Sequence, residues 1–318
     1  MTTLRAAVIG VGYLGNFHVQ KYLSLPDVDV VGLVETDAAR GEELRARYGI
    51  PVHQSLEPLL GALDLVSIVT PPAQHFAAAR DCLAAGIHVL VEKPVTATVA
   101  EAEQLIELAR ARRCVFQVGH LERFNPAVIA VKRRLTQPHR IEARRLSRFQ
   151  TRGTEVDVVL DLMIHDIDIV LSMVRAPLSR LHASGSVVVS GDIDVAHATL
   201  HFADGCVAEL TASRVNREPV RAMEIFQPGA CIAVDYLNHT LLVSEGNARD
   251  AAPAMSFEEE SLARTDVLMD EIRSFVAAVS SGQSPTVSGE DGKRALEVAV
   301  AISQEIRRQQ PPARVGAG

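Results

Sequence analysis

The sequence has few aromatic residues and few cysteines. Among its 318 residues there is no tryptophan, aromatic side chains make up 4%, and apolar and charged residues make up 47% and 22%. This composition is typical of a globular protein, and the length suffices for two domains with cores of Leu, Val, Ile and Ala. None of the cysteines is in a CxxC pattern, which favours reduced, buried thiols over a zinc or redox motif, and we expect no metal site. The cysteines are Cys82, Cys114, Cys206 and Cys231.

The sequence also lacks an excess of positive charge and a long uninterrupted apolar run. Its formal net charge of −7 argues against extensive nucleic-acid binding. The apolar segment Val158–Val174 carries Asp161, Asp166 and Asp168, which makes a membrane span costly. The apolar stretch Ala6–Ile9 runs directly into glycines, unlike a signal peptide. We therefore expect a cytoplasmic protein without a membrane or nucleic-acid partner.

The first 120 residues alternate short β-branched runs with longer helical patterns. This rhythm predicts a doubly wound parallel α/β sheet of the Rossmann type. The predicted strands are Leu4–Ile9, Val28–Val34, Leu65–Thr70, His88–Val91 and Val115–Val118, and the predicted helices between them include Ala38–Tyr48, Gln74–Ala85 and Val99–Ala111.

After Gly119 the pattern changes to that of an α+β domain. Shorter alternating segments over residues 181–243 predict a mainly antiparallel sheet. We expect a first domain over residues 1–120, a second over 121–310, and a mobile tail over 311–318. The other predicted elements are a strand at Arg140–Phe149 and helices at Pro126–Leu135, Val159–Met173, Asp266–Ser280 and Gly289–Arg308.

A GxGxxG motif directly follows the first predicted strand. It comprises Gly10, Gly12 and Gly15 with Tyr13 and Leu14 between the last two glycines, and it predicts a pyrophosphate site at a helix N-terminus. Such a turn alone is weak evidence. Here Glu35 stands 20 residues further on, near the end of the second strand, where a carboxylate accepts hydrogen bonds from ribose hydroxyls. Because that carboxylate would repel a 2′-phosphate, and the nearest arginine is Arg40, NAD is favoured over NADP.

Three other residues are candidates for catalysis. Lys93 follows the strand His88–Val91, at the edge where parallel sheets bind ligands, and Pro94 restricts it to extended geometry. Asp161 and His165 are four residues apart in a predicted helix and so project from one face, where a carboxylate orients an imidazole. Taken singly, a lysine at a surface and an Asp–His pair on a helix are more often structural.

Together with Thr70-Pro71-Pro72-Ala73-Gln74-His75 and the segments 85–94 and 161–168, these motifs resemble the glucose–fructose oxidoreductase / inositol dehydrogenase / rhizopine catabolism (Gfo/Idh/MocA) family. The resemblance spans essentially the whole chain. It implies a C-terminal α+β domain with a large, open antiparallel sheet that is often used in homodimer or homotetramer contacts.

The same resemblance implies NAD-dependent oxidation of a secondary alcohol. His165 would be the general base, tuned by Asp161, and Lys93 would stabilise the developing alkoxide. The residues implied to bind the cofactor are Gly10, Gly12, Tyr13, Leu14, Gly15, Glu35, Thr70, Pro71, Pro72, His75, Glu92 and Lys93.

Residues 121–152 hold nine Lys or Arg residues against two glutamates. Arginines there favour an anionic substrate. The run Gly119–Pro126, with Arg152-Gly153-Thr154, resembles the branch of the family that oxidises UDP-N-acetylglucosamine at C3, before an aminotransferase in lipid A biosynthesis. The residues implied to bind this nucleotide sugar are Lys93, Arg123, Phe124, Asn125, Arg148, Arg152, Thr154, Asp161 and His165.

Two alternatives stay open. The substrate could be a free polyol or sugar, such as inositol or glucose. The chain could instead be a non-catalytic NAD-binding regulator of the same fold, although the presence of Lys93, Asp161 and His165 favours an enzyme.

Overall fold

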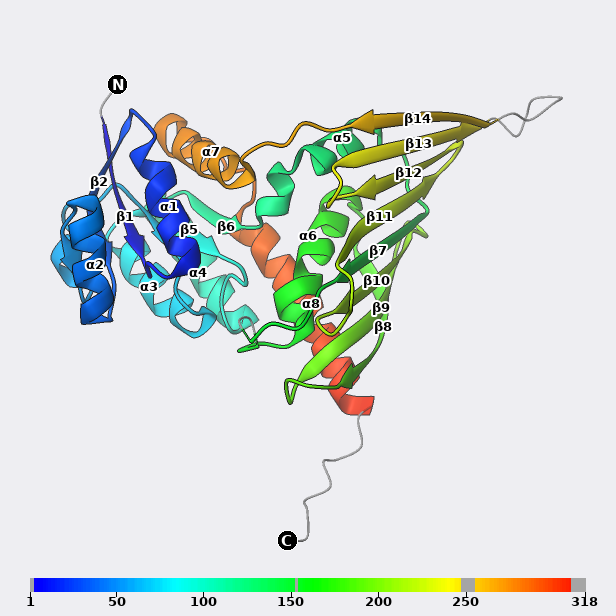
Figure 1. Cartoon of the computed structure of the whole chain (residues 1–318), viewed down its shortest axis with the longest axis horizontal. Coiled ribbons are helices and arrows are strands. Elements are labelled where there is room, and N and C mark those ends of the chain that lie inside the picture. Colours follow the sequence, from blue (N-terminus) through cyan, green and yellow to red (C-terminus); the bar gives the residue numbers. More distant parts are fainter. Residues whose placement is uncertain (1–2, 152–153, 247–254, 310–318) are drawn as a thin grey trace, which may run out of the picture. The chain divides into compact units, whose positions relative to one another are not determined.

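The computed structural model describes residues 3–151, 154–246 and 255–309, which form two compact units (Figure 1). The first unit comprises Met1–Phe124 and Thr265–Leu296, and the second comprises Asn125–Arg264 and Glu297–Gly318. This division differs from the single boundary expected after residue 120, because the chain returns to the first unit. The tail expected to be mobile lies wholly outside the described residues.

Six parallel strands form the sheet of the first unit, in the order β3-β2-β1-β4-β5-β6. The order reverses between β1 and β4, the place where doubly wound sheets bind ligands. The predicted parallel sheet is confirmed, with one short edge strand, β3, that the sequence did not reveal. The strands are β1 (Leu4–Ile9), β2 (Val28–Val34), β3 (Val52–His53), β4 (Leu65–Ile68), β5 (His88–Glu92) and β6 (Phe116–Gly119).

Local sequence signals explain where the helices of this unit begin and end. Thr98 and Glu101 form a reciprocal capping box at the start of α4. Asp37 and Asp266 cap α2 and α7, and Gly282 ends α7 in the left-handed conformation. The helices are α1 (Tyr13–Leu23), α2 (Ala38–Tyr48), α3 (Pro72–Ala84), α4 (Val99–Arg112) and α7 (Val267–Ser281), with short 3₁₀ turns at η1 (Glu57–Leu59) and η2 (Leu121–Phe124).

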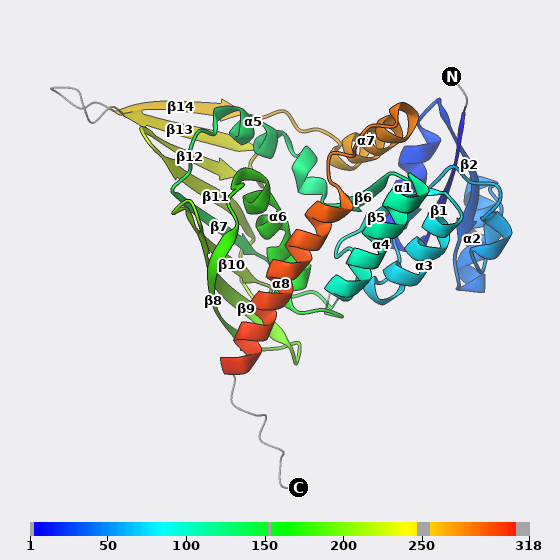
Figure 2. The ribbon, with the colours of Figure 1, turned by 180° about the vertical axis from the view of Figure 1, so that it is seen from behind.

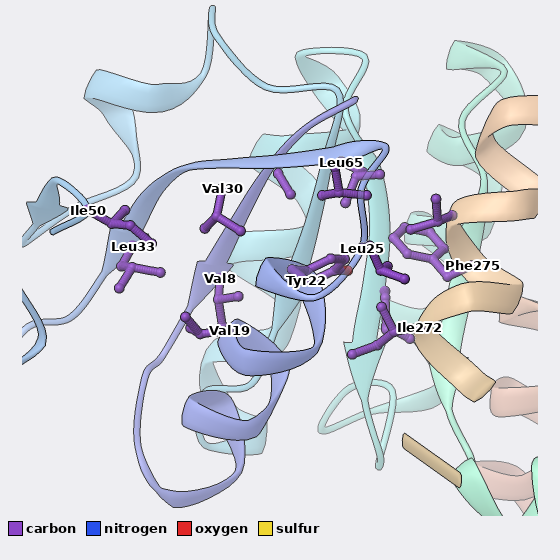
Figure 3. Close-up of a cluster of buried hydrophobic side chains, with 14 of the residues drawn as sticks. Val8, Val19, Tyr22, Leu25, Val30, Leu33, Ile50, Leu65, Ile272 and Phe275 are labelled. Atoms are coloured by element: carbon purple, nitrogen blue, oxygen red, sulfur yellow. The ribbon is translucent and has the colours of Figure 1, made fainter. Parts of the chain in front are cut away.

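Helix α7 belongs to the first unit because its apolar face completes that unit's core (Figure 3). Ile272 and Phe275 are fully buried in one cluster with Tyr22 of α1 and Leu65 of β4. Burying side chains of this size contributes about 1.5–3 kcal/mol each. An amphipathic pattern shows that a helix packs on something, but it does not show on which sheet. For this reason the sequence placed α7 in the second domain.

The second unit is built on an eight-stranded sheet in the order β14-β13-β12-β11-β7-β10-β9-β8. Strands β7 and β10 are parallel, and the other pairs are antiparallel, which confirms the mainly antiparallel prediction. The strands are β7 (Arg140–Leu146), β8 (Leu178–Val187), β9 (Ile193–Phe202), β10 (Val207–Ser213), β11 (Val220–Gln227), β12 (Ala230–Asp235), β13 (Thr240–Gly246) and β14 (Met255–Ser261).

Helices cover one face of this sheet (Figures 1 and 2). They are α5 (Pro126–Arg134), α6 (Ile164–Met173) and the second half of α8 (Gly289–Gln309), which begins in the first unit. The predicted helix Val159–Met173 is α6 preceded by a π-helical turn, η3 (Val159–Met163). None of the helices within the described ranges combines the length and apolarity of a membrane span.

One buried carboxyl group in the first unit stands out. Glu271 of α7 is fully buried, and neither of its carboxyl oxygens has a hydrogen-bond partner within the described part of the chain. Burial and the nearby Glu92 carboxylate raise the pKa of Glu271 well above its usual range. The folded protein therefore holds this group as a neutral acid at pH values where the unfolded chain releases the proton.

This difference gives a pH-dependent penalty on stability. Above the unfolded pKa of about 4.3, the contribution of Glu271 to the free energy of unfolding falls as the pH rises. We predict that Glu271→Gln, which cannot ionise, matches the parent in melting temperature near pH 4.5 and exceeds it by about 3–6 °C near pH 8. Thermal melts across this pH range measure the effect. Glu107→Gln, at an exposed position of α4, is the control for loss of one carboxylate. A difference in melting temperature that does not vary with pH contradicts the prediction.

Candidate active site

The carboxyl ends of the parallel strands lie in one row. Ile9 pairs with Val34 of β2 and Ile68 of β4, and Ile68 pairs in turn with Val91 of β5. The residues that follow these ends therefore meet at one edge of the sheet. They include the predicted site residues Gly10, Glu35, Thr70 and Lys93. The register thus assembles four expected cofactor residues from four separate strands.

The three glycines of the GxGxxG turn have different steric roles. Gly10 has φ +84°, and a Cβ atom there would lie 2.8 Å from the carbonyl oxygen of Val69. A Cβ on Gly15 would lie 2.0 Å from the carbonyl oxygen of Gly10. Gly12 is exposed and has nothing within 4 Å of its Cβ position, so its backbone is open to a bound group. The turn therefore fits a dinucleotide pyrophosphate.

The helix that follows this turn presents its N-terminus at the same place. Gly12 is the N-cap of α1 and supplies no side-chain cap, so the first-turn N–H groups can serve a phosphate. Tyr13 and Leu14 are exposed to 66% and 39%. Their backbone lies where the resemblance places the cofactor, and their side chains contribute little to the core.

Glu35 lies just beyond β2 and is partly exposed. One of its carboxylate oxygens accepts the backbone N–H of Asp37 at 3.1 Å, which fixes the side chain at the start of α2. The guanidinium of Arg40 pairs with Glu43 at 3.2 Å. The arginine nearest to Glu35 in sequence thus contacts a glutamate of its own helix.

His75 links the loop that follows β4 to the loop that carries Lys93. It is 1% exposed, and its ring nitrogens lie 2.8 Å from the carbonyl oxygens of Thr70 and Pro94. Burial lowers the pKa of His75, although the contacts with the two carbonyls oppose this shift. Pro71 and Pro72 stand at the N-cap and first position of α3. The segment Thr70–His75 thus supports the loop on which Lys93 stands.

Lys93 is partly buried, and its neighbour Glu92 points into the first unit. The Glu92 carboxylate is 3.2 Å from Nε2 of His18, and the His18 side chain is fully buried. A Cβ on Gly119 would lie 2.9 Å from that carboxylate. Sequence reasoning missed His18 as the residue that holds Glu92. The spacing of Gly15, His18 and Tyr22 on one buried face of α1 was the available signal.

In the second unit the predicted pair Asp161 and His165 lies at the start of the α6 region, and both residues are partly exposed. Asp161 stands in the π-helical turn, where the N–H of Ile164 reaches the carbonyl of Val159. Such turns are frequent at functional sites. Asp168, three residues beyond His165, is 1% exposed.

A buried ion pair fixes the helix beside His165. Arg145 of β7 donates two hydrogen bonds to Asp166, at 3.0 and 2.9 Å, and both side chains are 4% exposed. This fork geometry resists rotation of α6 on the sheet. Arg145 therefore has a structural role, although it belongs to the basic stretch that suggested an anionic substrate.

The residues predicted to bind substrate are distributed over both units. Arg123 is 3.6 Å from Asp291, and its side chain is 8% exposed. Phe124 is buried, and the Asn125 side chain caps α5 by accepting the N–H of Ala127 at 3.0 Å.

Two further predicted substrate residues lie in the second unit and are exposed or partly exposed. Arg148 pairs with Glu218 at 3.1 Å, and the Thr154 hydroxyl donates to the carbonyl of Thr151 at 2.7 Å. Arg152 lies outside the described residues.

Comparison with known proteins places the chain among oxidoreductases. Residues 4–120 match the profile of the oxidoreductase family with an NAD-binding Rossmann fold (GFO_IDH_MocA), and residues 127–228 match the GFO/IDH/MocA C-terminal domain. The UDP-N-acetylglucosamine 3-dehydrogenase of Acidithiobacillus ferrooxidans is 38% identical, covering 97% of this chain and all of the relative. A solved structure of that enzyme superposes with a TM-score of 0.90, at 36% identity, over 97% of this chain and 99% of the other. The myo-inositol 2-dehydrogenase of Thermotoga maritima is 26% identical over 96% of this chain and 97% of its own length.

The different surroundings of the glycines predict different effects of the same substitution. Gly12→Ala enters open space, so we expect an unchanged melting temperature and NAD affinity weakened by about tenfold or more, because the methyl group occupies the approach of the pyrophosphate. Gly15→Ala collides with the Gly10 carbonyl and should lower the melting temperature as well.

Calorimetric titration with NAD and thermal melts distinguish the two effects. Gly61→Ala, which also enters open space, is the control for the added methyl group. Normal NAD affinity in the Gly12→Ala variant would contradict the assigned role of the turn.

Proposed function

The chain belongs to the GFO/IDH/MocA oxidoreductase family, and on this basis we propose that it oxidises the C3 hydroxyl of UDP-N-acetylglucosamine to a ketone. The family assignment makes it an NAD-dependent sugar dehydrogenase. The observation that carries the choice of substrate is the 38% identity with UDP-N-acetylglucosamine 3-dehydrogenase along the whole length of both chains. The proposal places the chain in the cytoplasm, as a homodimer or homotetramer, before an aminotransferase in the lipid A precursor pathway.

The residues at the edge of the first sheet fit the cofactor. The glycine turn and the N-terminus of α1 would hold the pyrophosphate, and Glu35 would accept hydrogen bonds from the adenosine ribose. When bound, the nicotinamide of NAD accepts a hydride from the alcohol carbon. The chain must therefore remove the hydroxyl proton and stabilise the negative charge that develops on the oxygen.

We assign these tasks to three side chains. His165 accepts the hydroxyl proton. Because its Nδ1 atom is buried, we propose that Nε2 is the atom that accepts this proton. Asp161 favours the protonated imidazole that results. The Lys93 ammonium donates a hydrogen bond to the reacting oxygen and stabilises its charge. Lys93 belongs to the first unit, and Asp161 and His165 belong to the second.

The diphosphate of a nucleotide sugar could form ion pairs with the arginines. To do so it would have to displace the carboxylates that these arginines already contact. Arg148 is held by Glu218, and Arg123 by Asp291. Exposed pairs such as Arg148–Glu218 contribute only about 0–1 kcal/mol, so a diphosphate, with one negative charge on each phosphate group, can displace the carboxylate. Arg148 is therefore the better candidate for contact with the diphosphate.

A free polyol is the alternative substrate, supported by the 26% identity with the myo-inositol 2-dehydrogenase. We expect NADH to form when the protein is mixed with NAD and UDP-N-acetylglucosamine, and more when an aminotransferase removes the ketone. N-acetylglucosamine without the UDP group and myo-inositol serve as parallel substrates. Turnover of these two at equal efficiency would argue against a nucleotide-sugar enzyme, and binding of NAD without any turnover would favour a regulator.

The assigned role of Lys93 can be tested without disturbing cofactor binding. We predict that Lys93→Met lowers kcat by at least about 1,000-fold while NAD binds with similar affinity, because the lost ammonium acts on the reacting oxygen. Stopped-flow or steady-state NADH absorbance measures kcat, and titration measures NAD binding. Lys132→Met, at an exposed position of α5, is the control for loss of one positive charge. Turnover by Lys93→Met at the parent rate would refute the assignment.

A further inference from the structure

The start of the helix that carries Asp161 is anchored by a carboxylate outside the motifs quoted above. Asp157 lies just before the π-helical turn η3, and its side chain is fully buried. Its Oδ1 atom accepts the backbone N–H groups of Val159 and Leu160, each at 3.0 Å. Its carbonyl accepts the N–H of Asp161, also at 3.0 Å. One residue therefore fixes three consecutive hydrogen bonds at the beginning of the turn.

The second oxygen of this carboxylate is held from the far end of the chain. Arg307, in the last turns of α8, donates to Oδ2 of Asp157 at 3.0 Å. The same nitrogen of Arg307 lies 3.1 and 3.0 Å from the two carboxylate oxygens of Asp192, in the turn between β8 and β9. A buried carboxylate is costly without a partner, and Arg307 supplies one. The Arg307 side chain itself is half exposed.

A second arginine holds the neighbouring residue. Arg214, just beyond β10, donates to the carbonyl of Val156 at 2.8 Å, and its guanidinium is 4.0 Å from Asp194. The segment 156–157 is thus tied to the ends of β10 and α8. All these residues belong to the second unit, so the anchor is complete within it.

We propose that Asp157 and Arg307 are positioning residues for catalysis. Asp157 sets the origin and the widened geometry of the turn that presents Asp161, and Arg307 holds the Asp157 carboxylate in place. The inference rests on the proposed function, since it takes Asp161 and His165 as the proton-handling pair. A displacement of about 1 Å in such a pair can cost a factor of about 100 in rate.

The test compares Arg307→Met, Asp157→Asn and the double variant with the parent. Asn keeps an oxygen that can cap the turn but removes the charge that Arg307 binds. We expect kcat to fall by about 10- to 100-fold in each single variant, with the KM for NAD unchanged because the cofactor residues lie in the first unit. The double variant should lose no more than either single one, since both remove the same interaction. Arg307→Lys should recover much of the loss.

The matched control is Arg308→Met, which removes a neighbouring, more exposed arginine whose contacts among the described residues, with Gln304 and Glu305, lie on its own helix. A second measurement needs no substrate: amide hydrogen exchange of the peptide containing Val159–Met163. Exchange there should be faster in Arg307→Met than in Arg308→Met or the parent.

The outcomes separate this inference from the proposed function. Equal exchange in Arg307→Met and the control, or an unchanged kcat, overturns the positioning role. Parallel losses in kcat and in the NAD-binding fraction would also overturn it, because they indicate unfolding alone. An inactive parent protein contradicts the proposed substrate, and the exchange measurement then still decides whether Arg307 holds the turn.

Discussion

The parallel register of the six-stranded sheet is the constraint on which the site depends. Ile9, Val34, Ile68 and Val91 lie side by side, so the residues after them reach one edge together. The glycine turn, Glu35 and Lys93 come from segments that are far apart in the sequence. Slippage of one strand by a single residue would turn its side chains to the opposite face of the sheet and separate these groups. The buried apolar runs that fix this register are therefore as necessary to the chemistry as the polar residues that perform it.

Local patterns in the sequence were sufficient for most of the first unit. The bounds of β1, β2 and α2 agree with the predictions, because continuous apolar runs, an Asp N-cap and a Gly C-cap are local signals. Local patterns could not show to which unit α7 belongs, because its apolar face could pack on either sheet. The π-helical turn was equally hidden, because it has no spacing signature of its own.

Charge was the least predictable property. The stretch 121–152 is strongly basic in sequence, yet the fold brings acids to it from distant segments. Arg134 meets Glu258 and Glu260 of β14, Arg140 meets Glu209 of β10, and Arg145 meets Asp166. A window along the chain counts only neighbours in sequence, whereas pairing is decided by neighbours across the sheet. The excess of positive charge that suggested an anionic substrate is therefore much smaller in the folded protein. Arg148 remains the better candidate for contact with such a substrate.

The discontinuity of the first unit affects how the protein is made. Its core is incomplete until Ile272 and Phe275 of α7 arrive, although its last preceding residue is Phe124. At about 5–20 residues per second, a ribosome needs roughly 8–30 s to produce the intervening stretch. Throughout that interval the apolar surface awaiting α7 faces water. The nascent chain is thus a natural client for chaperones, and its two units cannot mature strictly in order from the N-terminus.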